Sequence, residues 1–258
     1  MNIMKKFLST IAIISMIFAQ DGTANAGWSW NGEFSTDVTL GDTVSFVSPY
    51  TGMSLSGKDW KLSSHLSDGS VEVEEAVYTV DAKVTSLTVG RQRVPYGLTT
   101  AWHRPSANAF VSEPGVQSYA EGIGVSTNII GVGVEAFYGN DEVWSLRGSY
   151  GLLGHDVGFS TNNNEGLLLD CSGVLNHSLS SVTSYFEYDL SEETSGNFWY
   201  RAVVAPTFTK GISALVGYSS VGDETETMYG IGYHYGSTYL RSELSAEGDV
   251  QVRISYSF

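Results

Sequence analysis

The chain has 258 residues, and its 28 acidic residues outnumber its 13 lysines and arginines, giving a formal net charge of −15. An acidic balance of this size argues against nucleic acid as a partner. The single cysteine, Cys171, excludes an intramolecular disulfide and has no neighbouring Cys or His with the spacing of a metal site. No linker, low-complexity tract or clear repeat interrupts the sequence, so we expect one domain and no metal.

The N-terminal residues have the pattern of a secretory signal peptide. Lys5 and Lys6 precede an apolar run at residues 7–19, and Ala24-Asn25-Ala26 has the small-x-small pattern of a cleavage site. This run falls short of the roughly 20 apolar residues that span a bilayer, which disfavours an anchoring helix. We predict a cleaved signal peptide at residues 1–26 and a mature domain at residues 27–258.

Apolar and polar residues alternate along most of the mature chain, which predicts strands with one face in an apolar medium and the other in water. The last strand shows this most regularly, from Val250 to the terminal Phe258. The same period of two recurs at residues 28–40, 60–66, 76–80, 130–138, 144–150, 182–190, 198–208, 212–218, 229–235 and 240–246. No window has helical periodicity, and the mean hydropathy of −0.04 fits strands that are half lipid-facing. The pattern predicts an all-β protein, a transmembrane antiparallel β-barrel.

The turn signals give a strand count. Tight turns are expected near Gly154, Lys210-Gly211 and Gly236-Ser237, alternating with longer, mostly acidic connections at residues 162–165, 190–197 and 221–226. Such barrels have an even number of strands, with short periplasmic turns and longer external loops. The count is sixteen if the weak run at residues 43–47 pairs with Leu40 and its neighbours. It is fourteen if two weak runs are loops; we predict sixteen.

One connection, Val94 to Gln117, is much longer than the others. In the sixteen-strand count it leaves the external end of the fifth strand. It contains three prolines together with Trp102, Arg104 and Glu113. Loops longer than about 12–15 residues in compact folds are usually functional or disordered, and this composition suits packing.

Two segments next to this loop resemble those of Gram-negative porins, both general diffusion porins and the phosphate-selective group. They are Glu74-Glu75-Ala76-Val77-Tyr78 and Leu87-Thr88-Val89-Gly90-Arg91-Gln92-Arg93-Val94-Pro95-Tyr96-Gly97. The terminal Phe258 resembles the assembly signal of outer-membrane barrels. The resemblance implies a loop folded into the barrel to constrict the pore, a homotrimer in the Gram-negative outer membrane, and no cofactor. It also implies contact with outer-membrane lipid and lipopolysaccharide, and with the barrel-assembly machinery through Phe258.

The alternation assigns strand charges to the inner face. The residues expected there are Arg147, Arg201, Arg241, Arg253, Glu33, Asp37, Glu135, Glu187, Asp189 and Glu243. Arg91 and Arg93 share a face with Leu87 and Val89. Because a charge facing lipid costs roughly 2–4 kcal/mol at the midplane, we assign both arginines to the lumen, with a bulge or a mixed wall.

Arg104 and Glu113 of the loop are then expected to approach the wall that carries Arg91, Arg93 and Arg147, forming the constriction. Two interpretations of these charges stay open. They either keep a wet lumen soluble by pairing with one another, or form a cationic strip that sorts solutes. Acidic external loops would enrich cations while the arginines favour anions, so we expect modest ion selectivity.

The predicted function is a porin, a water-filled channel for passive diffusion of small hydrophilic solutes and ions. A plugged structural or adhesive barrel is the alternative, and a barrel hydrolase is a further one. The hydrolase is disfavoured because none of the five histidines lies in a catalytic motif: His65, His103, His155, His177 and His234.

Overall fold

The computed structural model describes residues 28–40, 44–46, 50–67, 70–100, 119–163, 166–191, 196–246 and 248–257. The predicted signal peptide and Phe258 lie outside these residues. The first strands are β1 (Trp28–Leu40), β2 (Val44–Phe46), β3 (Tyr50–Gly57), β4 (Trp60–Ser67), β5 (Ser70–Ala82), β6 (Thr85–Arg93), β7 (Tyr119–Ile129), β8 (Val132–Gly139) and β9 (Trp144–Leu152). The others are β10 (His155–Asn162), β11 (Gly166–His177), β12 (Ser180–Asp189), β13 (Phe198–Pro206), β14 (Ile212–Val221), β15 (Glu224–Tyr235), β16 (Thr238–Ser245) and β17 (Val250–Ser257). Short 3-10 turns form η1 (Gly97–Thr100), η3 (Asn140–Glu142) and η4 (Thr207–Thr209).

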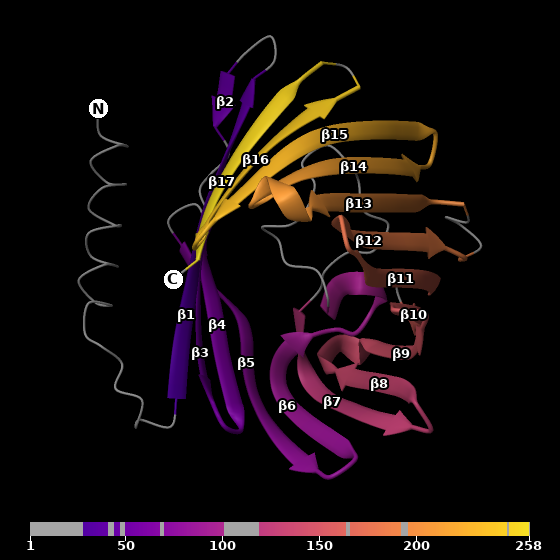
Figure 1. The fold of residues 1–258 in the computed structure, drawn as a ribbon. Helices are drawn as coiled ribbons and strands as arrows, with labels where there is room; N and C mark the ends of the chain where they lie inside the picture. The colour runs from indigo at the N-terminus through magenta and orange to yellow at the C-terminus, as the bar shows by residue number, and fades with distance from the viewer. Residues whose placement is uncertain are drawn as a thin grey trace.

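The strands form one closed antiparallel sheet (Figure 1). From β3 onward each strand pairs with the next strand in the chain, and β1 pairs with β17 to close the ring. β2 and β3 occupy a single position in the wall, because β2 pairs with residues 38–40 of β1 and β3 pairs with residues 28–35. The described wall therefore has sixteen strands, which confirms the predicted fold and strand number. The weak run does pair with Leu40, as expected.

The two ends of the barrel differ in their connections. At the short-turn end, every described hairpin but one turns over two residues, as at Ile130-Gly131 and Leu153-Gly154. Both residues of these two turns have positive φ, the geometry that matches the twist of paired strands. The first described residue, Trp28, and the last, Ser257, also lie at this end, as an even strand number requires.

The long connection leaves β6, the fifth strand of the wall, at the opposite end, the long-loop end, as predicted. The prediction of a long connection at residues 221–226 is wrong. β14 ends at Val221 and β15 begins at Glu224, because Gly222 takes a φ of +61° and permits a two-residue turn.

The polarity of the two faces is inverted relative to a soluble protein. Large apolar side chains are exposed on the outer face, among them Leu62, Val89, Ile123, Leu146 and Ile231. The inner face holds the buried polar side chains: Ser35, Ser63, His65, Ser145, Arg147, Ser160, Asp170, Glu187, Arg201, Arg241, Glu243 and Ser255. This inversion is what a strand with period-two alternation produces when its apolar face meets lipid.

Exposed aromatic residues mark both ends of the outer face. Trp28, Trp60 and Tyr256 lie near the short-turn end, and Tyr138 and Trp144 lie near the long-loop end. Two aromatic girdles around an apolar band are typical of barrels that cross a membrane. Among the described residues, no helix is long and apolar enough to cross a membrane.

Candidate functional site: the polar lumen

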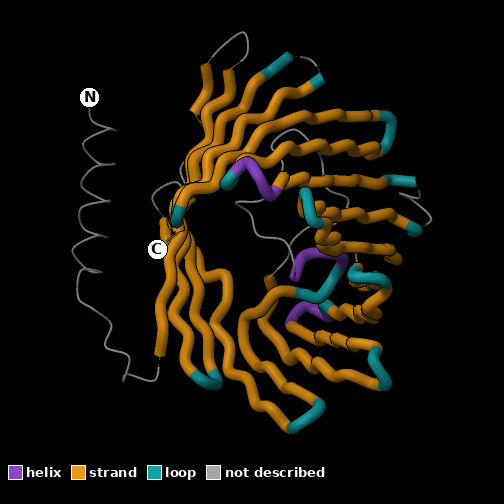
Figure 2. Tube along the Cα trace, viewed as in Figure 1, coloured by secondary structure: helices purple, strands orange, loops and turns teal. Residues whose placement is uncertain are grey.

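The chain turns back into the barrel directly after β6. We call residues 94–98 the inward segment. The 3-10 turn η1, which begins within it, lies inside the ring of strands beside β10–β12 (Figure 2). The side chains of Val94, Tyr96 and Leu98 are buried, with 1 or 2 % exposed. The predicted inward course of the long loop is therefore observed for its first residues, and residues 101–118 lie outside the described part.

Hydrogen bonds tie the inward segment to two wall strands. Ser145 Oγ on β9 donates to the carbonyl oxygen of Pro95 at 3.0 Å. Gly97 N donates to Ser160 Oγ on β10 at 2.8 Å. Both serines are almost completely buried, so these bonds satisfy backbone groups that no longer face water.

Glu187 on β12 is the central anchor. Its Oε1 accepts a hydrogen bond from Leu98 N at 2.5 Å, and its Oε2 accepts one from Trp199 Nε1 at 2.7 Å. Gly97 fits here because its φ is +57° and because a Cβ would lie 2.3 Å from Glu187 Oε1 and 2.5 Å from Leu168 Cδ2. Leu98 also packs with Trp199, Met228 and Tyr185 into an apolar cluster inside the barrel. We define the anchor region as Ser145, Ser160, Glu187 and Trp199, whose side chains contact the inward segment or one another.

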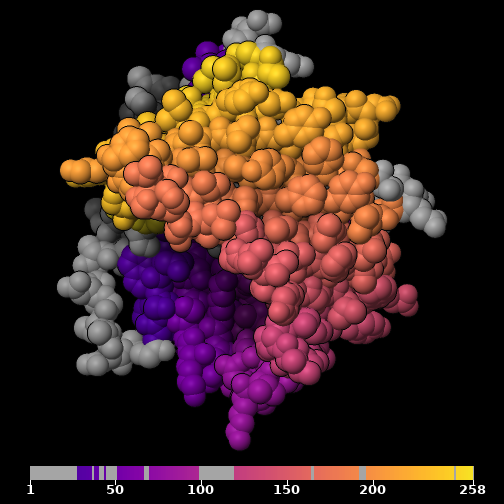
Figure 3. Space-filling model, turned by 45° about the vertical axis from the view of Figure 1, so that its right-hand side comes forward, coloured from indigo at the N-terminus to yellow at the C-terminus, as the bar shows by residue number. Residues whose placement is uncertain are grey.

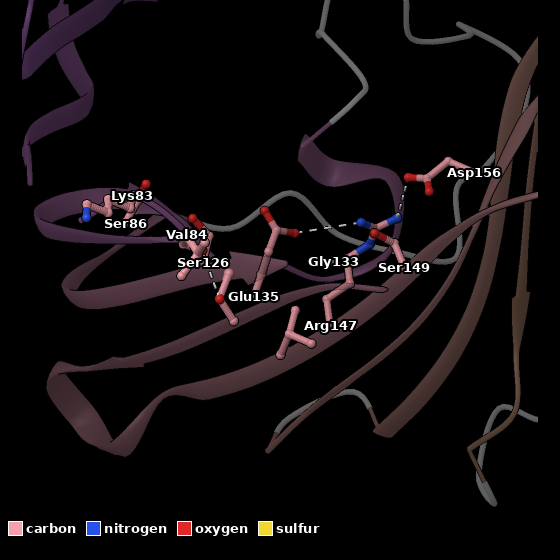
Figure 4. Close-up of a pocket in the computed structure, with 11 residues that line it drawn as sticks. Lys83, Val84, Ser86, Ser126, Gly133, Glu135, Arg147, Ser149 and Asp156 are labelled. Atoms are coloured by element: carbon pink, nitrogen blue, oxygen red, sulfur yellow. Dashed lines mark hydrogen bonds and ion pairs between the residues drawn. The ribbon is translucent and has the colours of Figure 1, made fainter. Parts of the chain in front are cut away.

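A polar recess of about 410 Å³ lies beside the anchor region (Figure 4). Arg147 lies at one end of it and makes a two-point ion pair with Asp170, from Nε at 3.2 Å and from Nη2 at 2.6 Å. Glu135 and Asp156 face the same guanidinium at 3.7 and 3.9 Å. These distances are too long for direct hydrogen bonds, so both carboxylates interact with Arg147 more loosely than Asp170 does. The lining residues are Lys83, Val84, Ser86, Ser126, Thr127, Gly133, Val134, Glu135, Arg147, Ser149 and Asp156.

Gly158 makes room for this ion pair. Arg147 is on β9 and Asp170 is on β11, so the pair must cross β10 at Gly158. A Cβ at Gly158 would lie 2.7 Å from Arg147 Nη2 and 2.7 Å from both carboxylate oxygens of Asp170. The glycine is therefore required by side-chain packing across strands.

Three arginines lie close together on the inner face of the C-terminal strands β13, β16 and β17. Arg241 Nε lies 2.5 Å from Glu243 Oε1, and Arg201 Nη2 lies 3.9 Å from the same oxygen. Arg253 stands opposite Arg241 in the strand ladder. Because Arg201 is 3 % exposed and Arg241 is 1 % exposed, most of their charge is directed at protein groups.

An acidic stretch lies across β4 and β5. His65 Nδ1 lies 3.1 Å from Glu74 Oε1, and His65 Nε2 lies 3.5 Å from Glu72 Oε2. Glu75 pairs with Lys61. The register of β4 against β5 shifts after Ser63, and such a bulge lets Glu74 and Glu75 both reach inner-face partners.

Arg91 and Arg93 lie on the outer face, which corrects the prediction that they line the lumen. Gln92 between them reaches inward, where its Oε1 would lie 2.4 Å from a Cβ at Gly124. The ladder runs without a register shift from Val89 to the arginines, so no bulge turns them around. The prediction used the cost of a charge at the membrane midplane. These are the last residues of β6, and near the interface that cost falls to roughly 0–1 kcal/mol.

The other predicted site residues divide into three groups. The inner face holds Arg147, Arg201, Arg241, Arg253, Glu33, Glu135, Glu187, Asp189 and Glu243. Asp37 stands opposite Arg253 in the ladder, and its side chain is not described. Arg104 and Glu113 lie outside the described residues. The structure brings Arg201, Arg241 and Arg253 together, while Arg147 belongs to the recess.

Sequence reasoning missed Asp170, Ser145 and Ser160. Residues 166–171 read Gly-Leu-Leu-Leu-Asp-Cys, so both faces of this strand look apolar and the alternation is weak. The inward orientation of Asp170 is evident only from the structure, where Leu168, which shares its parity, contacts the inward segment. Inward serines carry no signal, because most strands have them.

The described residues do not form a catalytic or metal centre. His155 Nε2 lies 3.3 Å from Ser184 Oγ on the outer face, but no carboxylate within the described ranges hydrogen-bonds the other ring nitrogen of His155. Serine hydrolases orient their histidine with such a third group. In the same part of the chain, no group of three His, Cys, Asp or Glu side chains is arranged to hold a metal ion.

A closed sixteen-stranded barrel with an apolar outer face, a polar inner face and a chain segment folded inside defines the class of porin-like barrels. Solved structures with this fold include variants of the porin of Rhodopseudomonas blastica. One is 13% identical with a TM-score of 0.64, and another is 12% identical with a TM-score of 0.62; each match covers 90% of this chain and 100% of the porin. Outer-membrane expressed OmpT of Vibrio cholerae is 11% identical with a TM-score of 0.54, over 90% of this chain and 97% of that one. No protein-family model and no curated protein sequence matches the chain, so the likeness establishes the fold.

Proposed function

We propose that the barrel is an outer-membrane channel through which small hydrophilic solutes and ions diffuse passively, without a cofactor or energy input. The observation that carries this proposal is the polar inner face of a closed barrel with an apolar outer face. A hollow opens beside the violet N-terminal strands in Figure 3. The recess supplies a further polar volume of about 410 Å³ along the wall.

The proposal includes the cellular setting. We infer cleavage after Ala26, insertion into the outer membrane of a Gram-negative cell, recognition by the assembly machinery through Phe258, and a homotrimer. The two aromatic girdles support the membrane placement. The mass of the purified protein in mild detergent tests the trimer, and a monomeric mass would contradict it.

The charge that solutes can reach favours cations. The side chains of Glu72, Asp156 and Glu135 are 61, 50 and 36 % exposed. Among the cations of the inner face, the side chains of Arg147 and Arg201 are 7 and 3 % exposed, while Lys61 is 42 % exposed and pairs with Glu75. Charged walls set the ion preference of a pore, so buried and paired arginines contribute less than accessible carboxylates. We therefore expect a moderate cation preference, stronger than the balance proposed from the sequence.

Planar-bilayer recording tests the function directly. The purified mature protein should give stepwise conductance. In a potassium chloride gradient, the sign of the reversal potential should show that cations permeate more readily than anions. A barrel that never conducts under varied salt and voltage would instead favour a plugged structural or adhesive role. Deleting residues 106–115 of the long loop should raise the conductance if that part also narrows the pore.

A further inference from the structure

One row of side chains across neighbouring strands leads into the recess. Ser86 on β6 stands opposite Ser126 on β7, which stands opposite Glu135 on β8. Arg147 on β9 follows next in the row, and Figure 4 shows the Glu135 carboxylate turned towards its guanidinium. Neighbouring strands are about 4.8 Å apart, so the row places two hydroxyl groups, a carboxylate and a guanidinium side by side.

A glycine opens the space beside this row. Gly133 precedes Glu135 by two residues on β8, so it lies on the same inner face, and it stands opposite Ser149. A Cβ at Gly133 would lie 2.9 Å from Ser149 Oγ, so a larger residue would displace this hydroxyl group. The resulting recess of about 410 Å³ is within the roughly 300–1,000 Å³ range of small-molecule sites.

The polar groups of the recess are incompletely paired. Within the described part of the chain, the carboxylates of Glu135 and Asp156 accept no hydrogen bond, and they face Arg147 at 3.7 and 3.9 Å. Glu135 Oε2 is in addition buried. The hydroxyl groups of Ser126 and Ser149 have no hydrogen-bond partner among the residues that the structure describes. The recess therefore offers acceptors and hydroxyl groups to a solute.

The charge of the recess selects the sign of that solute. Asp170 is fully buried and neutralises Arg147 through the two-point ion pair. The accessible charges that remain are the carboxylates of Glu135 and Asp156 and the ammonium group of Lys83. Figure 4 shows Lys83 on the side of the recess away from Arg147. Two carboxylates against one ammonium group leave a negative recess, which favours a cationic solute.

The recess lies on the short-turn side of the inward segment. On β9, which runs from the long-loop end to the short-turn end, Ser145 binds that segment and Ser149, four residues later, lines the recess. A solute that enters at the long-loop end and passes the inward segment therefore meets the recess before it leaves the barrel.

We propose that the recess binds small solutes that combine a primary ammonium group with hydroxyl groups, as amino sugars do. This rests on the channel function proposed above and assigns a solute class to the recess. The ammonium group donates charge-assisted hydrogen bonds to Glu135, and the hydroxyl groups of the solute bond with Ser126 and Ser149. These contacts are few and open to water, so binding is weak, as release from a channel requires.

The test measures how glucosamine blocks the ion current in planar bilayers. In wild-type channels the current should fall with glucosamine concentration, with half-saturation in the millimolar range. Glu135→Gln removes the ionic acceptor and should raise the half-saturating concentration roughly tenfold, the loss expected for one charge-assisted hydrogen bond. Glu121→Gln, which removes a carboxylate from the outer face, is the matched control and should leave the block unchanged.

Gly133→Ala separates a binding site from a general effect of charge. The methyl group fills the floor of the recess and displaces Ser149 Oγ while the charge of the channel stays the same. We expect the block to weaken several-fold and the reversal potential in potassium chloride to keep its wild-type value. Gly148→Ala, where a Cβ meets nothing within 4 Å, is the control. Heat-dependent gel mobility verifies that each barrel is folded, and an unchanged block in the folded Gly133 variant would overturn the site.

Three further probes define the solute class. Glucose and N-acetylglucosamine lack the ammonium group, and ethylammonium lacks the hydroxyl groups, so each should block wild-type channels several-fold less than glucosamine. Equal block by ethylammonium would reduce the effect to the cation preference of the channel and overturn the proposal. Equal block by glucose or N-acetylglucosamine would overturn it as well, because the carboxylate would then have no role.

Binding is also measured without conductance, so that the two proposals fail separately. Saturation-transfer NMR detects glucosamine bound to the purified mature barrel and to each variant in mild detergent. Binding that depends on Glu135 in a barrel that never conducts would reject the channel and leave the site standing. Conductance with neither block nor binding would overturn the site and leave the channel standing.

Discussion

The anchor region and the recess are neighbouring parts of one polar wall, yet they use their charged groups differently. In the anchor region, both carboxylate oxygens of Glu187 accept hydrogen bonds from protein donors, and the inward segment covers the side chain. In the recess, Glu135 and Asp156 stand 3.7 and 3.9 Å from Arg147, too far for direct hydrogen bonds, and their side chains are 36 and 50 % exposed. The Arg147–Asp170 pair lies at the border between the two.

The difference shows that an inward carboxylate has one of two roles. A buried carboxylate with protein donors holds the lumen in shape, and its loss leaves those donors unpaired. An accessible carboxylate with loose partners changes the field that a solute meets. Four substitutions would break or sharpen this distinction.

Glu187→Ala should have the largest effect. It leaves Leu98 N and Trp199 Nε1 without an acceptor, and each unpaired buried donor costs about 1–3 kcal/mol. We expect the inward segment to leave the wall, so single-channel conductance should rise and the temperature of the heat-dependent gel shift should fall. Glu142→Ala, at an exposed turn, is the control. Wild-type conductance in the Glu187 variant would show that the segment is held by other contacts.

Asp170→Ala should destabilise the barrel nearly as much. It leaves the guanidinium of Arg147 buried without its two-point partner, which costs about 3–5 kcal/mol for a buried pair. The unfolding midpoint in denaturant measures this loss. Asp156→Ala is the matched control: its carboxylate is half exposed and 3.9 Å from Arg147, so its removal should cost less than about 1 kcal/mol. Equal losses from both would refute the distinction between the border pair and the recess.

Gly158→Ala should have a smaller effect through packing alone. The new methyl would push against Arg147 and Asp170, and overpacking of this kind costs about 1–3 kcal/mol. Gly148→Ala on β9 is the control, because a Cβ there meets nothing within 4 Å. Both variants are compared by their denaturant midpoints. If the Gly158 variant is as stable as the Gly148 variant, the Arg147–Asp170 pair does not depend on the space left by the missing Cβ at Gly158.

Neutralising the recess carboxylates should have the smallest effect, on selectivity and not on stability. With Glu135→Gln/Asp156→Asn, the reversal potential in a salt gradient should move towards anions. The shift should shrink at high salt, since charges are screened beyond about 8–10 Å at physiological ionic strength. Glu121→Gln on the outer face should leave the reversal potential unchanged. A larger shift from Glu121 than from the recess would reverse the assignment of faces.

The sequence by itself determined the barrel and the polarity of its walls. A period of two places successive side chains on opposite faces, so the runs at residues 144–150 and 250–257 show which residues face lipid. Pairing between chain neighbours follows from short turns such as Gly236-Ser237, which is why the strand number could be counted. The site of the long loop after the fifth strand followed from the same count.

Only the tertiary structure decided which inward groups are structural and at what depth in the membrane Arg91 and Arg93 lie. Glu187 meets Leu98 across 89 residues of sequence, and Ser160 meets Gly97 across 63, so no local pattern carries these contacts. Alternation put Arg91 and Arg93 on the face of Val89. Assigning them to the lumen required both arginines to lie at the membrane midplane, but they end β6 near the interface. The cost of an outward charge depends on its height in the membrane, and height is set by strand length and register across the closed sheet, which no single strand contains.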